Sequence, residues 1–153
     1  MPTACRLSQT LGLMSKSVSY LQLKPEAALP AISSATPARM VVVVEAAVPA
    51  EWQSIVSKWI VGAGCLYMMA WGVDCSSWDD SVDMANLEEF MFGEIPEDRF
   101  VMTTWHADEP LTEVFWFSKN NAYHPTVELQ RTVLLHISDE NQEQELLAAY
   151  AEA

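Results

Sequence analysis

The sequence predicts an α/β domain in which a mainly parallel sheet lies between two layers of helices. Strand-length runs such as Met40-Val-Val-Val-Val-Glu45 are apolar at successive positions, which is typical of strands buried on both faces. Segments with helical periodicity separate these runs, and parallel strands require such crossovers. The chain has 153 residues, half of them hydrophobic, which suffices for one packed core and excludes a disordered chain.

The first two strands and helices follow in order from residue 40. Pro49 suits the first turn of a helix that Gly62 or Gly64 can end. The apolar residues of this helix recur at helical spacing: Trp52, Ile55, Val56, Trp59, Ile60 and Ala63. Residues 65–71 are expected to form the second strand. A helix should follow to about residue 90, with Ser76 or Ser77 as its N-cap.

The second half of the chain repeats the alternation. Residues 100–105 predict a third strand, and Asp108 is expected to cap a helix that starts at Pro110 and stops before His124. The fourth strand lies within residues 126–137, and Ser138 should cap a final helix. We therefore expect a three-layer sandwich with a four-stranded sheet, in the order 2-1-3-4 when the strands are numbered along the chain. The alternative is a mixed sheet whose third and fourth strands pair antiparallel.

Residues 1–39 differ in composition from the rest. They contain four bases, one acid and no tryptophan, whereas the remaining 114 residues contain four bases, 20 acids and all six tryptophans. We interpret residues 1–39 as a poorly structured N-terminal extension or leader, and residues 40–153 as a single α/β domain. A targeting peptide and a short helix docked on the domain are the alternatives.

The charge balance limits the possible partners. With 21 acids and 8 bases, the net charge is −13, which disfavours direct binding to nucleic acid because the phosphates would be repelled. No apolar run approaches the roughly 18 residues of a membrane-spanning helix, so no membrane partner is expected. Three cysteines and the lack of a secretory signal predict a reducing compartment, the cytoplasm. The oligomeric state stays open.

Ligands of open parallel sheets bind beyond the carboxyl ends of the strands, so candidate site residues are sought there. If the protein is an enzyme, the catalytic residues would be Cys75, His106 and Glu45, with Cys75 as the nucleophile and His106 as its base. A hard cation has four weak candidate ligands, which come from separate turns, so we expect them to be scattered and no metal to bind; they are Glu45, Asp74, His106 and Asp108.

Sequence fingerprints of known cofactor sites are missing. The chain has no GxGxxG after the first strand, no Walker lysine, no GxSxG, no CxxC and no HExxH, and we expect no cofactor. His136 lies inside the apolar run of the fourth strand, where a hydrogen-bonded core histidine is the simplest interpretation. His124 precedes Pro125 and is expected to shape a loop.

Three segments resemble a family of small bacterial α/β proteins of unknown function. They are residues 69–83 (Met-Ala-Trp-Gly-Val-Asp-Cys-Ser-Ser-Trp-Asp-Asp-Ser-Val-Asp), residues 101–106 (Val-Met-Thr-Thr-Trp-His) and residues 113–119 (Glu-Val-Phe-Trp-Phe-Ser-Lys). The resemblance covers roughly residues 40–138. It implies a soluble protein carried by a bacterium or a phage, and it brings no activity and no catalytic residue.

Two function classes remain. The first is a non-enzymatic acidic binding protein, similar to an immunity protein or an inhibitor, that docks on a basic protein partner. The residues expected to bind this partner lie on the second helix and just before it: Asp74, Trp78, Asp79, Asp80 and Asp83. Trp52 and Trp116 are further candidate contacts. The second class is a small α/β enzyme or nucleotide-sensing domain with its site at the carboxyl ends of the strands.

Overall fold

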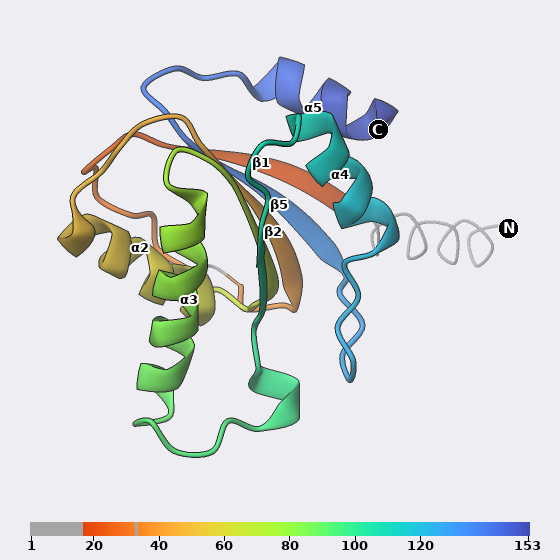
Figure 1. The fold of residues 1–153 in the computed structure, drawn as a ribbon. Coiled ribbons are helices and arrows are strands. Elements are labelled where there is room, and N and C mark those ends of the chain that lie inside the picture. Colours follow the sequence, from red (N-terminus) through yellow and green to blue (C-terminus); the bar gives the residue numbers. More distant parts are fainter. Residues whose placement is uncertain (1–16, 33) are drawn as a thin grey trace, which may run out of the picture.

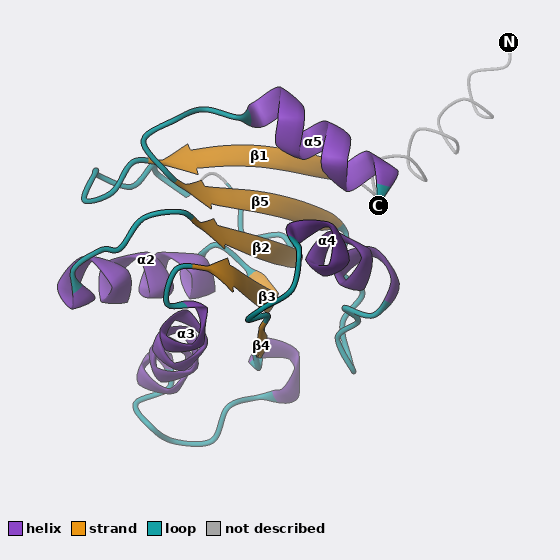
Figure 2. Ribbon diagram, turned by 45° about the horizontal axis from the view of Figure 1, so that its top comes forward, coloured by secondary structure: helices purple, strands orange, loops and turns teal. Residues whose placement is uncertain are grey.

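The computed structural model describes residues 17–32 and 34–153. It confirms the α/β class and the three layers (Figure 1). Helices α2 (Ala50–Gly62) and α3 (Cys75–Glu89) cover one face of the sheet. Helices α4 (Leu111–Asn120) and α5 (Glu143–Glu152) cover the other face, as Figure 2 shows.

The sheet has five strands where four were expected. They are β1 (Ser17–Leu23), β2 (Ala38–Val44), β3 (Cys65–Gly72), β4 (Met102–Trp105) and β5 (Arg131–Ile137). Every pairing is parallel, and the order is β1-β5-β2-β3-β4. The expected order 2-1-3-4 is wrong, because the four predicted strands run 4-1-2-3 across the sheet. The mixed-sheet alternative is wrong as well.

The additional strand explains the difference in order. β1 pairs with β5 over its whole length, from Ser17 opposite Arg131 to Leu23 opposite Ile137. β5 in turn pairs with β2, so the last strand of the chain is inserted between the first two. The helices after β2 and β3 lie on one face, whereas α4 returns the chain along the other face. The direction of winding therefore reverses between β2 and β5.

The interpretation of residues 1–39 as an extension outside the fold is wrong from Ser17 onward. β1 belongs to the sheet, and β2 begins at Ala38, two residues before the expected boundary. The connection between these strands is fastened to α2, because the indole N–H groups of Trp52 and Trp59 donate hydrogen bonds to Ala27 O and Pro30 O, both at 2.9 Å. Residues 1–16 of the predicted leader lie outside the described residues.

Alternate residues of the central strands build two cores. Met40, Val42 and Val44 of β2 pack toward α2 and α3, whereas Val41 and Val43 pack toward α4 and α5. Because both faces of β2 are covered, all five of these side chains are buried, which accounts for the unbroken apolar run in the sequence. No helix of the described chain is both long and apolar enough to cross a membrane.

A glycine brings the end of β3 close to β2. Gly72 has a φ of +104°, and a Cβ atom at this position would lie 2.0 Å from the carbonyl oxygen of Val44. The same oxygen accepts a hydrogen bond from the N–H of Val73 at 2.9 Å. Only glycine fits this close approach, which sets where the chain leaves the sheet to enter α3.

The helices begin differently from the sequence expectation. α3 starts at Cys75, with Asp74 as its N-cap in the left-handed region (φ 53°), so neither Ser76 nor Ser77 caps it. Pro110 is the N-cap of α4, and Asp108 lies in the preceding turn with a φ of 63°. Before α5, the N–H of Glu143 donates to Asn141 Oδ1, while the Ser138 hydroxyl accepts from Glu140 N–H.

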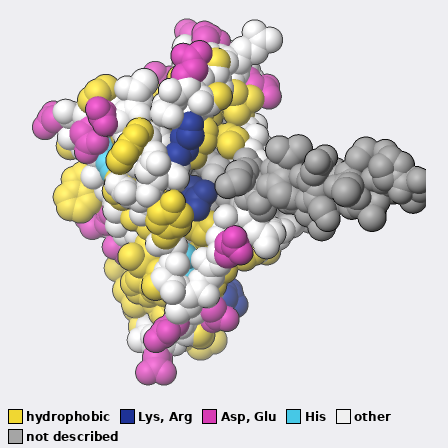
Figure 3. Space-filling view, turned by 90° about the vertical axis from the view of Figure 1, so that its right-hand side faces the viewer, with side chains coloured by type: hydrophobic (Ala, Val, Ile, Leu, Met, Phe, Trp, Pro, Cys, Tyr) yellow, Lys and Arg dark blue, Asp and Glu magenta, His cyan; other side chains and the backbone are white. Residues whose placement is uncertain are grey.

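Acidic side chains face the solvent, as expected from the scarcity of bases. Every Asp and Glu except Asp79 is exposed. Among the described residues, a single Lys or Arg side chain forms an ion pair with a carboxylate, namely Arg99 with Glu89. Figure 3 shows one side of the molecule, on which acidic side chains gather mostly toward the periphery.

Because β1 covers the edge of β5, we predict that deleting residues 1–36 destabilises the domain. The deletion leaves the backbone of β5 without one of its two neighbours and removes both indole hydrogen-bond acceptors. Thermal unfolding and size-exclusion chromatography of the truncated and full-length proteins test this. A truncated protein that is monomeric and melts at the wild-type temperature would contradict it.

Candidate functional site

The four candidate metal ligands do not converge at the carboxyl edge of the sheet. The Glu45 carboxylate hydrogen-bonds to His136, and His106 is buried and bonds to Glu109 through Nδ1 at 3.2 Å. Asp74 and Asp108 are exposed at their turns. Within residues 17–32 and 34–153, no group of three or more His, Cys, Asp or Glu side chains could hold a metal ion.

The candidate catalytic residues also lie apart. Cys75 is buried in the core beneath α2 and α3. His106 packs edge-to-face on Phe117 of α4, with ring centroids 5.0 Å apart, on the opposite face of the sheet. The other ring nitrogen of His106 bonds to the Thr104 hydroxyl at 2.9 Å. Cys75, His106 and Glu45 therefore do not form a nucleophile–base arrangement, because the helices after β3 and β4 leave toward different faces.

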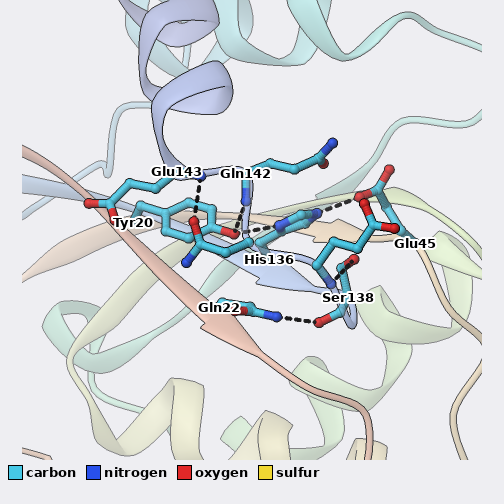
Figure 4. Close-up of polar contacts among 9 residues, drawn as sticks. Tyr20, Gln22, Glu45, His136, Ser138, Gln142 and Glu143 are labelled. Atoms are coloured by element: carbon cyan, nitrogen blue, oxygen red, sulfur yellow. Dashed lines mark hydrogen bonds and ion pairs between the residues drawn. The ribbon is translucent and has the colours of Figure 1, made fainter.

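A connected set of polar side chains lies at the carboxyl ends of β2 and β5 (Figure 4). His136 of β5 is completely buried, and its Nε2 bonds to Oε1 of Glu45 at the end of β2. Its Nδ1 lies 2.7 Å from the hydroxyl oxygen of Tyr20 in β1. The backbone N–H of Gln142, just before α5, donates to the same hydroxyl at 3.0 Å. Three strands and one helix start are thus joined through one imidazole.

The hydrogen bonds fix the tautomer of His136. A carboxylate oxygen can only accept, so the contact with Glu45 requires a proton on Nε2 of His136. In the neutral ring Nδ1 then accepts the proton of Tyr20, whose oxygen accepts from the backbone N–H of Gln142. Nε2 then carries the ring proton and donates it to the Glu45 carboxylate. Both ring nitrogens are satisfied, which confirms the expectation of a hydrogen-bonded core histidine.

Tyr20 is a poor nucleophile in this setting. Burial raises the pKa of its phenol; the Gln142 N–H opposes the rise, and the nearby carboxylates of Glu143, Glu45 and Glu145 add to it. A phenol kept neutral retains its proton for the hydrogen bond to His136. The Tyr20–His136–Glu45 chain therefore acts as a polar connection within the sheet.

The residues expected to bind a partner divide into two groups. Asp74, Asp80 and Asp83 are exposed as expected. Trp78 and Asp79 are buried, at 1% and 6% exposure, so the expectation that they meet a partner is wrong. The reason is the helical face: Cys75, Trp78, Val82 and Ala85 point into the core, and Asp79 shares their side of α3. Trp52 is also buried, whereas Trp116 is exposed.

Asp79 is a buried carboxyl group without full hydrogen bonding. Its Oδ2 is buried and has no partner. Burial and, to a lesser extent, the Asp83 carboxylate raise the pKa of Asp79 to about 6, against the lowering effect of Thr103. The side chain therefore carries much of its charge at neutral pH at a cost to stability.

An exposed apolar patch lies beside these residues, on α3 and the segment that leads to β4. Its members share large side chains that face solvent: Met84, Leu87, Met91, Phe92 and Phe100. Met91 and Phe92 are 89% and 64% exposed, and both have a positive φ, 53° and 60°. Two consecutive non-glycine residues in this region are strained, so the loop holds these side chains outward at an energetic cost. We refer to this patch, with its surrounding acids, as the α3–β4 surface.

The acids around the apolar patch make it strongly negative. They are Asp80, Asp83, Glu88, Glu89, Glu94, Glu97 and Asp98; the bases near them are Arg99 and, beside Glu88 and Glu89, Lys58 of α2. A groove of about 380 Å³ crosses the surface between Leu87, Ile95 and Phe100, with Asp83 and Thr103 in its wall. Toward the bottom of Figure 3, apolar and acidic side chains lie next to each other. Residues 91 and 92 were missed in the sequence because an apolar residue is assigned to the core by default.

Comparison with family models matches residues 18–153 to a domain of unknown function (DUF7684). The chain belongs to this family. The match begins in β1 and so covers the sheet described above, including the strand that the sequence analysis placed outside the domain. Comparisons with curated proteins and with solved structures find no match. The resemblance to a family of unknown function is confirmed, and it assigns no activity to the DUF7684 domain.

Replacing Tyr20 with Phe is predicted to destabilise the DUF7684 domain by about 1–3 kcal/mol, because the acceptor Nδ1 of the fully buried His136 loses its donor. The free energy of unfolding in urea measures this. Tyr123→Phe is the matched control, since Tyr123 is 64% exposed, and it should change stability by less than about 0.5 kcal/mol. Equal effects of the two variants would contradict the role given to Tyr20.

Replacing Asp79 with Asn is predicted to stabilise the DUF7684 domain at pH 7–8 and not at pH 3.5. The folded pKa of about 6 lies above the ordinary value of 3.8, so the carboxyl group costs nothing while it is protonated in both states, and its cost builds up as the pH rises from 3.8 to about 6. The gain should be on the order of 1–3 kcal/mol. Urea unfolding at both pH values tests this, with the exposed Asp80→Asn as control. A gain that does not depend on pH would refute the explanation.

Proposed function

We propose that this DUF7684 protein is a non-enzymatic binding protein, of the immunity or inhibitor type, that docks a basic protein partner on the α3–β4 surface. The observation that carries the proposal is the exposure of Met91 and Phe92 on a strained backbone, inside a ring of carboxylates. Apolar side chains surrounded by polar ones are the usual composition of a protein interface.

The apolar part of the surface supplies binding energy. Burying a Met or Phe side chain that was exposed gains roughly 1.5–3 kcal/mol. Met91, Phe92 and Phe100 are the large apolar residues of the loop after α3, and Met84 and Leu87 continue the patch along α3. Because the loop is held by hydrogen bonds from Phe92 N–H to Leu87 O and from Gly93 N–H to Phe90 O, little ordering is required on binding.

The acids supply selectivity for a basic partner. Seven exposed carboxylates surround the patch, and only Glu89 has an ion pair, with Arg99. Such a field speeds the encounter with a positive surface and repels acidic proteins. The rings of Phe92 and Phe100 can also receive arginine side chains of the partner by cation–π contact. The partner that fits is therefore a protein with arginine or lysine around an apolar pocket.

The alternative, a small enzyme or nucleotide-sensing domain, is supported by the fold class alone. Its candidate residues Cys75 and His106 lie on opposite faces of the sheet, and Glu45 is engaged by His136. A cytoplasmic location remains part of the proposal, and it is supported by Cys65 and Cys75, which form no disulfide within the described residues.

The test is affinity capture from source cells with the full chain, followed by binding kinetics with the purified partner. We expect a basic protein whose capture is lost with the double variant Met91→Ser, Phe92→Ser. The control is Trp116→Ser, which removes a comparably exposed aromatic side chain from α4. If both variants capture the same protein equally, the α3–β4 surface is not the docking site.

The charge contribution is measured separately. With the triple variant Asp80→Asn, Glu94→Gln, Asp98→Asn, the association rate should fall about tenfold at low salt and much less at high salt. The same loss of charge on α5, in Glu143→Gln, Glu145→Gln, Glu152→Gln, should leave the rate nearly unchanged. A captured partner that is not basic, or an association rate that does not depend on the salt concentration, would overturn the proposal.

A further inference from the structure

A cavity of about 660 Å³ lies at the opposite, amino edge of the sheet, on the side covered by α4 and α5. The second residues of three neighbouring strands line it: Val18 of β1, Arg39 of β2 and Thr132 of β5. Cavities of this size hold small organic ligands in proteins. It is larger than the groove on the α3–β4 surface and shares no residue with it.

The cavity is one of the few positive places on this acidic molecule. Arg39 and Lys119 both line it, and neither has an Asp or Glu side chain within ion-pair distance among the described residues. In Figure 3, basic side chains lie near the middle of the face, beside apolar ones. In a chain with 21 acids and 8 bases, cations without a carboxylate partner beside a cavity favour an anionic ligand.

Lys119 and Arg39 differ in the hydrogen-bond donors that they still have available for a ligand. Lys119 Nζ donates to the backbone oxygens of Tyr150, Ala151 and Ala153, so it is occupied with the end of α5. Arg39 donates through Nε to Ala122 O at 3.2 Å and through Nη1 to the Thr132 hydroxyl at 3.5 Å. Its Nη2 has no partner among the described residues. A guanidinium group that is fixed by two bonds and open at one edge suits a planar or tetrahedral oxyanion.

The rest of the wall is apolar or neutral. Its apolar lining includes Tyr123, Val127, Leu129 and Tyr150, of which Leu129 and Tyr150 are buried. His124 carries no charge there: its Nε2–H donates to Phe100 O, while its Nδ1 accepts from the N–H groups of Thr126 and Val127. Glu128 is the acid at the cavity, and it is exposed at the rim.

We propose that this cavity binds a small organic anion with an apolar body. Its acidic group lies on the open edge of the Arg39 guanidinium, and its apolar body packs against Val127, Leu129 and the tyrosine rings. This ligand is independent of the protein partner proposed above, because the two sites share no side chain.

The probe for the test is 8-anilinonaphthalene-1-sulfonate, an aromatic anion whose fluorescence rises in apolar surroundings, titrated into the full chain. We expect saturable binding that weakens at least tenfold, about 1.4 kcal/mol, in Arg39→Gln, because a hydrogen bond to a charged group is lost. The control Lys58→Gln removes the same charge from an exposed site on α2 and should bind as the wild type does. Equal affinity of the two variants would overturn the proposal.

Two further variants make the result decisive. Val127→Trp fills the cavity without changing the charge, so it should also weaken binding, and it decides the question if Arg39→Gln melts at a lower temperature than the wild type. Phe92→Ser removes an apolar side chain of the α3–β4 surface and should leave dye binding unchanged. If the dye responds to Phe92→Ser and not to Val127→Trp, it binds the exposed patch and the cavity proposal is wrong.

Discussion

The fold depends on a single buried polar residue at the place where its two halves meet. His136 lies in β5, which is the last strand in the chain and yet has a neighbour on each side. An imidazole at this depth must have both nitrogens bonded, and the partners come from β2 and β1, over 91 and 116 residues of chain. These bonds require that all three strands end in register. They therefore hold β1, β2 and β5 together where the three strands end.

Local patterns in the sequence were sufficient for the four α-helices and for four of the five strands, and insufficient for the order of the strands. α2 was predictable because Trp52, Val56 and Ile60 recur at helical spacing on a strongly apolar face. β1 was missed because it lies at the edge of the sheet, where Ser17 and Ser19 face solvent and leave a weak alternating pattern. Without β1, nothing in the sequence shows that β5 has a second neighbour.

The candidate site was likewise predictable only in part. The exposure of the acids could be predicted, since unpaired carboxylates are costly to bury and bases are few. Asp79 is the exception, and its side of α3 is set by Trp78 and Val82, which pack into the core. The outward Met91 and Phe92 could not be predicted, because their orientation comes from two backbone dihedrals and not from their chemistry.

The two proposed sites belong to one physical scheme, in which several of the few positive groups of this strongly negative molecule are held in defined contacts. Arg131 donates to three backbone oxygens, Lys119 to three more, and Arg99 pairs with Glu89 above the ring of Phe90. The electrostatic field outside the molecule is therefore dominated by the carboxylates. One hydrogen bond joins the two sites directly, since His124 in the cavity wall donates to Phe100 O on the α3–β4 surface at 2.8 Å. The same imidazole accepts two backbone N–H groups of its own loop, which fixes the ring in one orientation. A ligand that leaves this ring in place therefore leaves its contact with Phe100 O unchanged.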